Sequence, residues 1–161
     1  MSRKKDVMSW GLIALVLLVV GATALYVLWP QLQQHTTLHL GDGVFTARVA
    51  KTQVERDLGL GGTHNLRQDQ VMLFIYDSDD KWPRAMKDMN YPIDIVWLDK
   101  DKKVVYIVKN APPESYPYED FTPKQKARYV VELSVGTVAQ KAITIGDGAS
   151  FDENNLQGFK L

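Results

Sequence analysis

The sequence contains no cysteine among its 161 residues. This absence excludes disulfides, thiol nucleophiles, cysteine-ligated zinc and iron–sulfur clusters, and it leaves the redox environment of the protein unmarked. Histidine is scarce, with three residues, and there is no His-Glu-x-x-His motif. His35 and His39 have helical spacing but no acidic third ligand nearby. We therefore predict no metal site and no cofactor.

An excess of charge of either sign is also missing, because 19 Lys and Arg residues balance 19 Asp and Glu residues. Nucleic-acid binding needs Lys and Arg clustered on one face, so we predict no nucleic-acid partner. Hydrophobic residues make up 45% and charged residues 24%, which is the balance of a globular protein. The length suits one domain of ordinary size.

Signature motifs of the common enzyme classes are absent as well. The sequence has no Gly-x-Ser-x-Gly elbow, no phosphate-binding Gly-rich loop and no dinucleotide-binding glycine pattern. Residues 77–88 place acidic side chains as a calcium loop does, but Trp82 occupies the sixth place, where the turn demands glycine. The motifs therefore leave open whether the protein is an enzyme.

What the sequence does contain is one long uncharged run at residues 10–29. A helix of this length, at about 1.5 Å per residue, spans a hydrocarbon core of roughly 30 Å. Basic residues at positions 3–5 precede the run, so the positive-inside rule keeps the N-terminus in the cytoplasm. We predict a single-pass signal-anchor in the cell membrane, with a cytoplasmic N-terminus at 1–9, a transmembrane helix at 10–29 and an extracytoplasmic C-terminal domain.

A cleaved signal peptide is the alternative for the same run. Ala22-Thr23-Ala24 has the small-x-small form of a cleavage site, although the apolar stretch continues beyond it. Both interpretations export the domain that follows.

Beyond a juxtamembrane linker at 30–43, the apolar residues mostly alternate with polar ones, as in half-buried strands. Thr52 and Glu55 have the spacing of a helix capping box, and residues 136–141 could form a short helical segment. We predict an all-β sandwich or jelly roll of five to seven strands at 44–148, with one or two short helices and a C-terminal tail at 149–161. Strands are expected at 44–50, 71–76, 93–99, 104–108, 127–133 and 143–145.

Several short motifs then resemble domain-of-unknown-function family 192. The hallmark of that family is a Phe-Trp-Met-Lys-Asn-Thr box followed by Pro-Leu-Asp, and Met86-Lys87 and Pro92-Ile93-Asp94 fall at the same spacing. Further matching segments, in the family's order, are Glu55–Gly61, Val71–Phe74, Ala111–Pro113, Arg128–Leu133 and Gly146-Asp147. The resemblance implies a compact, commonly exported β-sandwich without an established activity.

The chain also departs from the family pattern. Arg84 and Ala85 replace the aromatic pair of the box, Asp88 replaces its Asn, and Gly61 replaces a Met. If the aromatic pair lines a pocket in the family, that pocket is altered in this chain.

Asp94 is the residue that most needs an explanation. It begins a face that otherwise carries Val96 and Leu98, and a buried carboxylate is costly unless it is paired or hydrogen-bonded. One interpretation is structural: Asp94 accepts backbone N–H bonds from the turn at 89–92, with Lys87 as its counter-ion. The other is a ligand-binding polar cluster at the mouth of the sandwich. Its candidate residues are Lys87, Asp88, Asp94, Glu55, Arg56 and Glu132.

Three functions remain open. The first is a membrane-anchored extracytoplasmic module that binds a small polar ligand or an envelope component. The second is an acid–base hydrolase or isomerase that uses Asp94 and Lys87, which would need a second titratable group with an opposed pKa near Asp94. The third is an accessory protein that docks onto a membrane partner. A concave pocket would favour the first two functions, and a flat apolar patch would favour the third.

Overall fold

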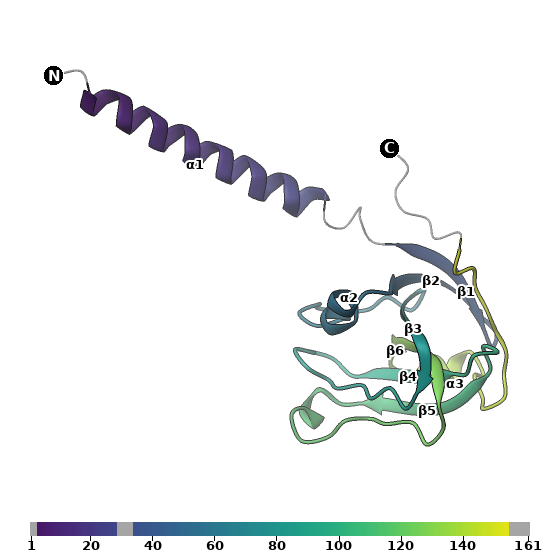
Figure 1. Cartoon of the computed structure of the whole chain (residues 1–161). Coiled ribbons are helices and arrows are strands. Elements are labelled where there is room, and N and C mark those ends of the chain that lie inside the picture. The colour runs from purple at the N-terminus through teal and green to yellow at the C-terminus, as the bar shows by residue number, and fades with distance from the viewer. Residues whose placement is uncertain (1–2, 29–33, 155–161) are drawn as a thin grey trace. The chain divides into compact units, whose positions relative to one another are not determined.

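A computed structural model describes residues 3–28 and 34–154 of the chain (Figure 1). It separates into two compact units. One contains a long helix, α1 (Arg3–Leu28), and the other contains a β-sheet with short helices.

The prediction of a transmembrane helix is wrong. Helix α1 does form in this part of the chain, but no helix within the described residues is both long and apolar enough to cross a membrane. The helix and the uncharged run do not coincide, because α1 begins at Arg3, includes the charged residues 3–6 and ends at Leu28. Trp29 lies outside the described residues. The location of the domain outside the cytoplasm stays a prediction.

The second unit is built on one seven-stranded sheet that curves into a half-barrel (Figure 1). The strand order is β5-β4-β6-β3-β2-β1-β7, in which β2 and β3 are parallel and the other pairs are antiparallel. The strands are β1 (His35–Leu40), β2 (Gly43–Ala50), β3 (Gln70–Asp80), β4 (Ile93–Leu98), β5 (Val104–Ala111), β6 (Ala127–Ser134) and β7 (Ala149–Ser150). The helical elements are α2 (Gln53–Leu58), α3 (Thr137–Gln140) and the 3₁₀ turn η2 (Pro113–Ser115).

The sheet carries a core on each face, which corrects the prediction of a two-sheet sandwich. Alternate residues along each central strand belong to different cores, so β4 is buried at all six positions. The first core includes Leu38, Phe45, Val49, Leu73, Val96, Leu133, Val138 and Phe151. The second core includes Met72, Phe74, Tyr76, Met86, Ile95, Trp97 and Val130. Most first-core residues come from the curved strands themselves, with Val138, Ile143 and Phe151 added from outside them, and the second core includes the loop residues Leu60 and Met86.

Most of the predicted elements are present. Four predicted strands correspond to β2, β3, β4 and β6, the hairpin 93–108 corresponds to β4 and β5, and α3 lies within 136–141. The predicted strand at 143–145 is absent from the described structure. The sheet also contains two strands that were not predicted: β1 lies in the predicted linker and β7 in the predicted tail. Strand β1 was missed because its buried face includes the polar residue Thr36 beside Leu38 and Leu40.

The segment before β7 links opposite sides of the curved sheet. Val104 N–H donates to the Asp147 carbonyl at 2.8 Å, and Ala149 N–H donates to the Lys102 carbonyl at 2.8 Å. Two residues of β7 then pair with β1, with Ala149 opposite Leu40. The C-terminal segment thereby brings the β4–β5 hairpin and β1 together at one end of the half-barrel.

Candidate functional site

Asp94 is a buried acceptor that joins three elements. Its side chain lies with the first core and is 1% exposed. One carboxylate oxygen accepts the backbone N–H of Asn110 at 2.9 Å, and the other accepts that of Val138 in α3 at 2.9 Å. The predicted acceptor role is therefore correct, but the donors are the end of β5 and the first turn of α3, not the turn at 89–92.

Lys87 and Asp88 lie apart from this carboxylate. Both are exposed, in the segment that follows the second-core residue Met86. Among the described residues, no ion pair joins Lys87 to Asp94. The backbone of Asp88 accepts the N–H of Gly62 at 2.8 Å, so this segment contacts the glycine-rich loop after α2. The predicted cluster of Lys87, Asp88 and Asp94 is not assembled.

Glu55 and Arg56 belong to helix α2. Glu55 forms the predicted capping box with Thr52: its carboxylate accepts two backbone N–H groups, from Lys51 at 2.9 Å and Thr52 at 2.8 Å. Burial alone would raise the pKa of Glu55, but these hydrogen bonds outweigh it and the pKa is lowered. Arg56 donates to the carbonyls of Lys51 and Ile75. Glu55 therefore caps the start of α2, and Arg56 ties the helix to β3.

Glu132 is the candidate with the closest charged partner. Its carboxylate, on the second-core face of β6, pairs with Arg84 at 2.9 Å (Nε to Oε1). Glu132 is buried, with 4% of its side chain exposed, and Arg84 is partly buried, with 14% exposed. The guanidinium also lies 3.8 Å above the centre of the Phe74 ring and hydrogen-bonds the Tyr76 side chain. Desolvation by burial would lower the pKa of Arg84, but the attraction of Glu132 and Tyr76 and the hydrogen bonds to both side chains together outweigh it, and the pKa is raised.

A second arginine approaches the same carboxylate from the neighbouring strands. Arg48 on β2 is opposite Met72, and Met72 is opposite Glu132, so the three residues form one row across the sheet. Arg48 donates from Nε to the Met72 sulfur at 3.0 Å and from Nη2 to the Gly59 carbonyl. Burial lowers the pKa of Arg48, and the nearby Glu132 carboxylate partly opposes this effect.

We call Arg48, Arg84 and Glu132 the arginine cluster. Glu132 was predicted as a candidate, but the two arginines were not. Arg48 alternates with Ala47 and Val49, which places it on the second face of β2, and Arg84 stands where the resembled box carries an aromatic residue. These two signals could have identified the cluster.

A groove opens elsewhere, beside the C-terminal segment. It encloses about 510 Å³ and is lined by Thr37, His39, Lys102, Ser150, Phe151, Asp152, Glu153 and Asn154. None of the six predicted candidates lines it. The Lys102 ammonium lies 4.1 Å from the centre of the Phe151 ring and pairs with Glu153 at 3.2 Å.

Tyr129 fixes the carboxylate beside the groove. The hydroxyl of this buried tyrosine donates to Glu153 at 2.8 Å, and the ring meets Phe151 edge-on at a centroid distance of 5.1 Å. Burial raises the pKa of Tyr129, and the hydrogen bond to Glu153 raises it further. The groove wall is therefore anchored to the first core.

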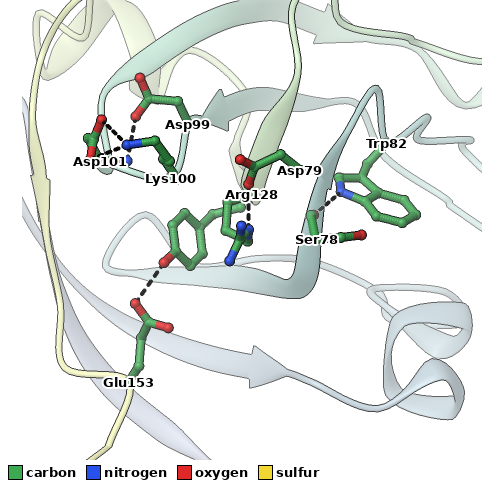
Figure 2. Close-up of polar contacts among 9 residues, drawn as sticks. Ser78, Asp79, Trp82, Asp99, Lys100, Asp101, Arg128 and Glu153 are labelled. Atoms are coloured by element: carbon green, nitrogen blue, oxygen red, sulfur yellow. Dashed lines mark hydrogen bonds and ion pairs between the residues drawn. The ribbon is translucent and has the colours of Figure 1, made fainter.

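Acidic residues gather near the β4–β5 hairpin, but they are matched by donors (Figure 2). Asp79 pairs with Arg128, and Asp101 pairs with Lys100 at 2.9 Å. Asp99 accepts backbone N–H bonds within the turn. No group of three metal-ligating side chains occurs in the part of the chain that the structure describes.

Comparison with known proteins identifies the family. The profile of the DUF192 family, described as an uncharacterized ACR, matches residues 36–151. The chain therefore belongs to this family, as the motifs indicated. A UPF0127 protein from Thermococcus gammatolerans is 28% identical over 106 residues, which span 65% of this chain and 65% of that protein.

Two crystal structures share the fold. A protein of unknown function from Novosphingobium aromaticivorans has a TM-score of 0.65 and 25% identity, over 72% of this chain and 83% of its own. A protein from Sinorhizobium meliloti, described as a candidate transcription regulator, has a TM-score of 0.66 and 24% identity, over 74% of this chain and 93% of its own. At this identity the second likeness concerns the fold alone.

The first prediction concerns Asp94. Asp94→Ala should lower the free energy of unfolding by about 2–5 kcal/mol, because it leaves two buried N–H groups without an acceptor. Asp101→Ala, which removes an exposed carboxylate, should change it by no more than about 0.5 kcal/mol. Urea unfolding measures both values. A loss at Asp94 no larger than that of the control would contradict the role assigned to this carboxylate.

The second prediction concerns the buried ion pair. Glu132→Leu should cost about 3–5 kcal/mol of unfolding free energy, because it leaves Arg84 buried without its carboxylate. Adding Arg84→Met to the same chain should recover part of that loss. A double-mutant cycle measured by urea unfolding gives the coupling, and simple additivity of the two single losses would show that the pair is not coupled.

The third prediction concerns alkaline pH. The pKa of Tyr129 is higher in the folded protein than in the unfolded chain, so Tyr129 stabilises the fold fully below about pH 10. As the pH rises further, the unfolded chain loses the phenol proton first, and this contribution to the free energy of unfolding is lost. Tyr76 and Tyr91 also have raised pKa values. Tyr129→Phe should therefore make the alkaline decline in unfolding free energy shallower without abolishing it. An unchanged pH profile from pH 8 to 11 would contradict the assignment.

Proposed function

We propose that this DUF192 protein binds a small polar ligand, and that the ligand occupies the groove beside the C-terminal segment. The observation that carries the proposal is the groove itself. Its volume of about 510 Å³ falls within the range of small-molecule sites, roughly 300–1,000 Å³. Polar side chains make up most of its lining, whereas the first core lies behind Phe151.

The lining offers both donors and acceptors. Thr37 and Ser150 supply hydroxyl groups, His39 supplies an imidazole, and Glu153 supplies a carboxylate held in place by Tyr129. Because Lys102 and Tyr129 fix that carboxylate before a ligand arrives, little side-chain entropy is lost on binding. This preorganisation supports recognition of hydroxyl or amine groups.

Acid–base catalysis by Asp94 and Lys87 has less support. Both carboxylate oxygens of Asp94 are engaged by backbone N–H groups, and Lys87 is an exposed residue of another segment. A general base must lie within reach of the proton that it removes, and Asp94 is buried in the first core. Docking onto a partner would be favoured by a flat apolar patch, whereas the groove is concave and polar.

The test compares two matched variants. Ser150→Arg places a long side chain on an exposed position of the groove wall, and Ala139→Arg adds the same charge at an exposed position outside it. Thermal unfolding is measured with a panel of hexoses, amino acids and small diamines. We expect at least one compound to raise the melting temperature of the wild-type protein and the Ala139→Arg variant, but not that of Ser150→Arg.

Two outcomes would overturn the proposal. One is a panel that leaves the wild-type melting temperature unchanged throughout. The other is a ligand-induced increase that Ser150→Arg retains in full, because the ligand would then bind elsewhere.

A further inference from the structure

The groove beside the C-terminal segment already holds one ammonium group, which belongs to Lys102. Its Nζ donates to the Phe151 carbonyl at 2.9 Å and pairs with Glu153 Oε1 at 3.2 Å. The same atom lies 4.1 Å from the centre of the Phe151 ring, within the distance of a cation–π contact. A carbonyl, a carboxylate and an aromatic face are typical partners of an ammonium group. One wall of the groove is therefore suited to a cation of this kind.

The backbone of the C-terminal segment binds a second lysine. Lys51, which follows β2 and does not line the groove, donates from Nζ to the Glu153 carbonyl at 2.8 Å. Between the two lysines, the Asp152 carbonyl accepts the Thr36 hydroxyl at 3.1 Å. Three successive carbonyls, those of residues 151–153, thus accept side-chain donors, and two of these donors are ammonium groups. The segment acts as an acceptor for ammonium groups from distant parts of the chain.

The charges that line the groove favour a cationic ligand. Lys102 supplies one positive charge, whereas Asp152 and Glu153 supply two negative charges, so the lining has a formal charge of −1 when histidine is counted as neutral. Arg128 also interacts with Glu153, but it lies outside the lining and Asp79 balances its charge. An anionic ligand would therefore meet net repulsion in the groove, and a cation would meet net attraction.

The positions left for a ligand offer hydrogen-bond acceptors. Glu153 uses Oε1 for both Tyr129 and Lys102, and its second oxygen takes no part in these contacts (Figure 2). Ser150 and His39 are opposite each other in the pairing of β7 with β1, and both are exposed, so their side chains lie on one face. An ammonium group has three donors and no acceptor, and so it matches a carboxylate beside a hydroxyl and an imidazole.

We propose that the groove binds a small molecule through a primary ammonium group, which Glu153 recognises beside Lys102. This inference rests on the proposed function, because it names the chemical class of the groove ligand. Lys102 fills the position over the Phe151 ring, so the ligand uses the acceptors near Ser150. Because Lys102 and the ligand carry charges of the same sign, Lys102 also limits the affinity of the site.

The test uses three probes with the same carbon chain: n-butylamine, n-butanol and butyltrimethylammonium, at about pH 7, where butylamine is protonated. Sodium chloride at matched ionic strength is the reference. Butylamine should raise the melting temperature of the wild-type protein in a saturable way. Butanol, which lacks the charge, should not raise it. Butyltrimethylammonium keeps the charge but has no N–H donors, so it should bind more weakly than butylamine.

Two variants should change the affinity for butylamine in opposite directions. Glu153→Gln removes the negative charge but keeps a similar shape, and it should weaken the affinity about tenfold or more. Lys102→Met removes the competing ammonium group while Tyr129 still holds the carboxylate, so it should strengthen the affinity, and it serves if Glu153→Gln does not fold. Glu119→Gln neutralises an exposed glutamate outside the lining and should bind butylamine as the wild type does.

The outcomes separate this inference from the proposed function. If hexoses stabilise the wild type but not Ser150→Arg, and butylamine does no more than sodium chloride, the groove is a ligand site but its ligand is not an amine. The inference also fails if butanol matches butylamine, if Lys102→Met weakens butylamine binding, or if Glu153→Gln and Glu119→Gln bind equally. If butylamine stabilises Ser150→Arg as much as the wild type, the amine binds outside the groove and both proposals fail.

Discussion

The second unit depends on one constraint: a single sheet must be covered on both faces. Strands β3 and β4 bury residues of both parities, so each face needs its own cover. The first core is closed by α3 and the C-terminal segment, and the second by loop residues such as Leu60 and Met86. Asp94 and the arginine cluster place charged groups in these layers, and each is hydrogen-bonded to a segment outside the sheet: Asp94 to α3, and Arg48 to Gly59. The hydrogen bonds that satisfy these charged groups therefore also attach segments outside the sheet to it.

Local features could be predicted from the sequence because they depend on neighbouring residues. The Thr52–Glu55 capping box and the β4–β5 hairpin are set by short-range spacing, and both were predicted correctly. The number of sheets could not be predicted in this way. A strand covered on both faces gives the same apolar pattern in one curved sheet as in two stacked sheets, so Val71–Tyr76 fitted either arrangement. Only long-range pairing, such as that of β4 with β6, distinguishes them.

The candidate site shows the same limit. The sequence singles out Asp94 and Glu132 as carboxylates within apolar runs, and both are buried. Their partners lie far along the chain, at Val138 and Arg84, and no local pattern specifies these contacts. The sequence suggests a pairing of Lys87 with Asp94 because Lys87 lies five positions before Pro92. Strand alternation instead directs Asp94 to the first core, whereas the segment that carries Lys87 follows the second-core residue Met86.

The pairing of β7 with β1 has a consequence for how this domain can be joined to others. The first and last strands of the sheet are neighbours, with His39 opposite Ser150. The chain therefore enters and leaves the sheet along the same edge. Domains whose ends lie together tolerate circular permutation and insertion into loops of a host protein. A circular permutant is therefore feasible. A short linker would join the end of β7 to the start of β1, and new termini would be placed in the exposed turn after β4.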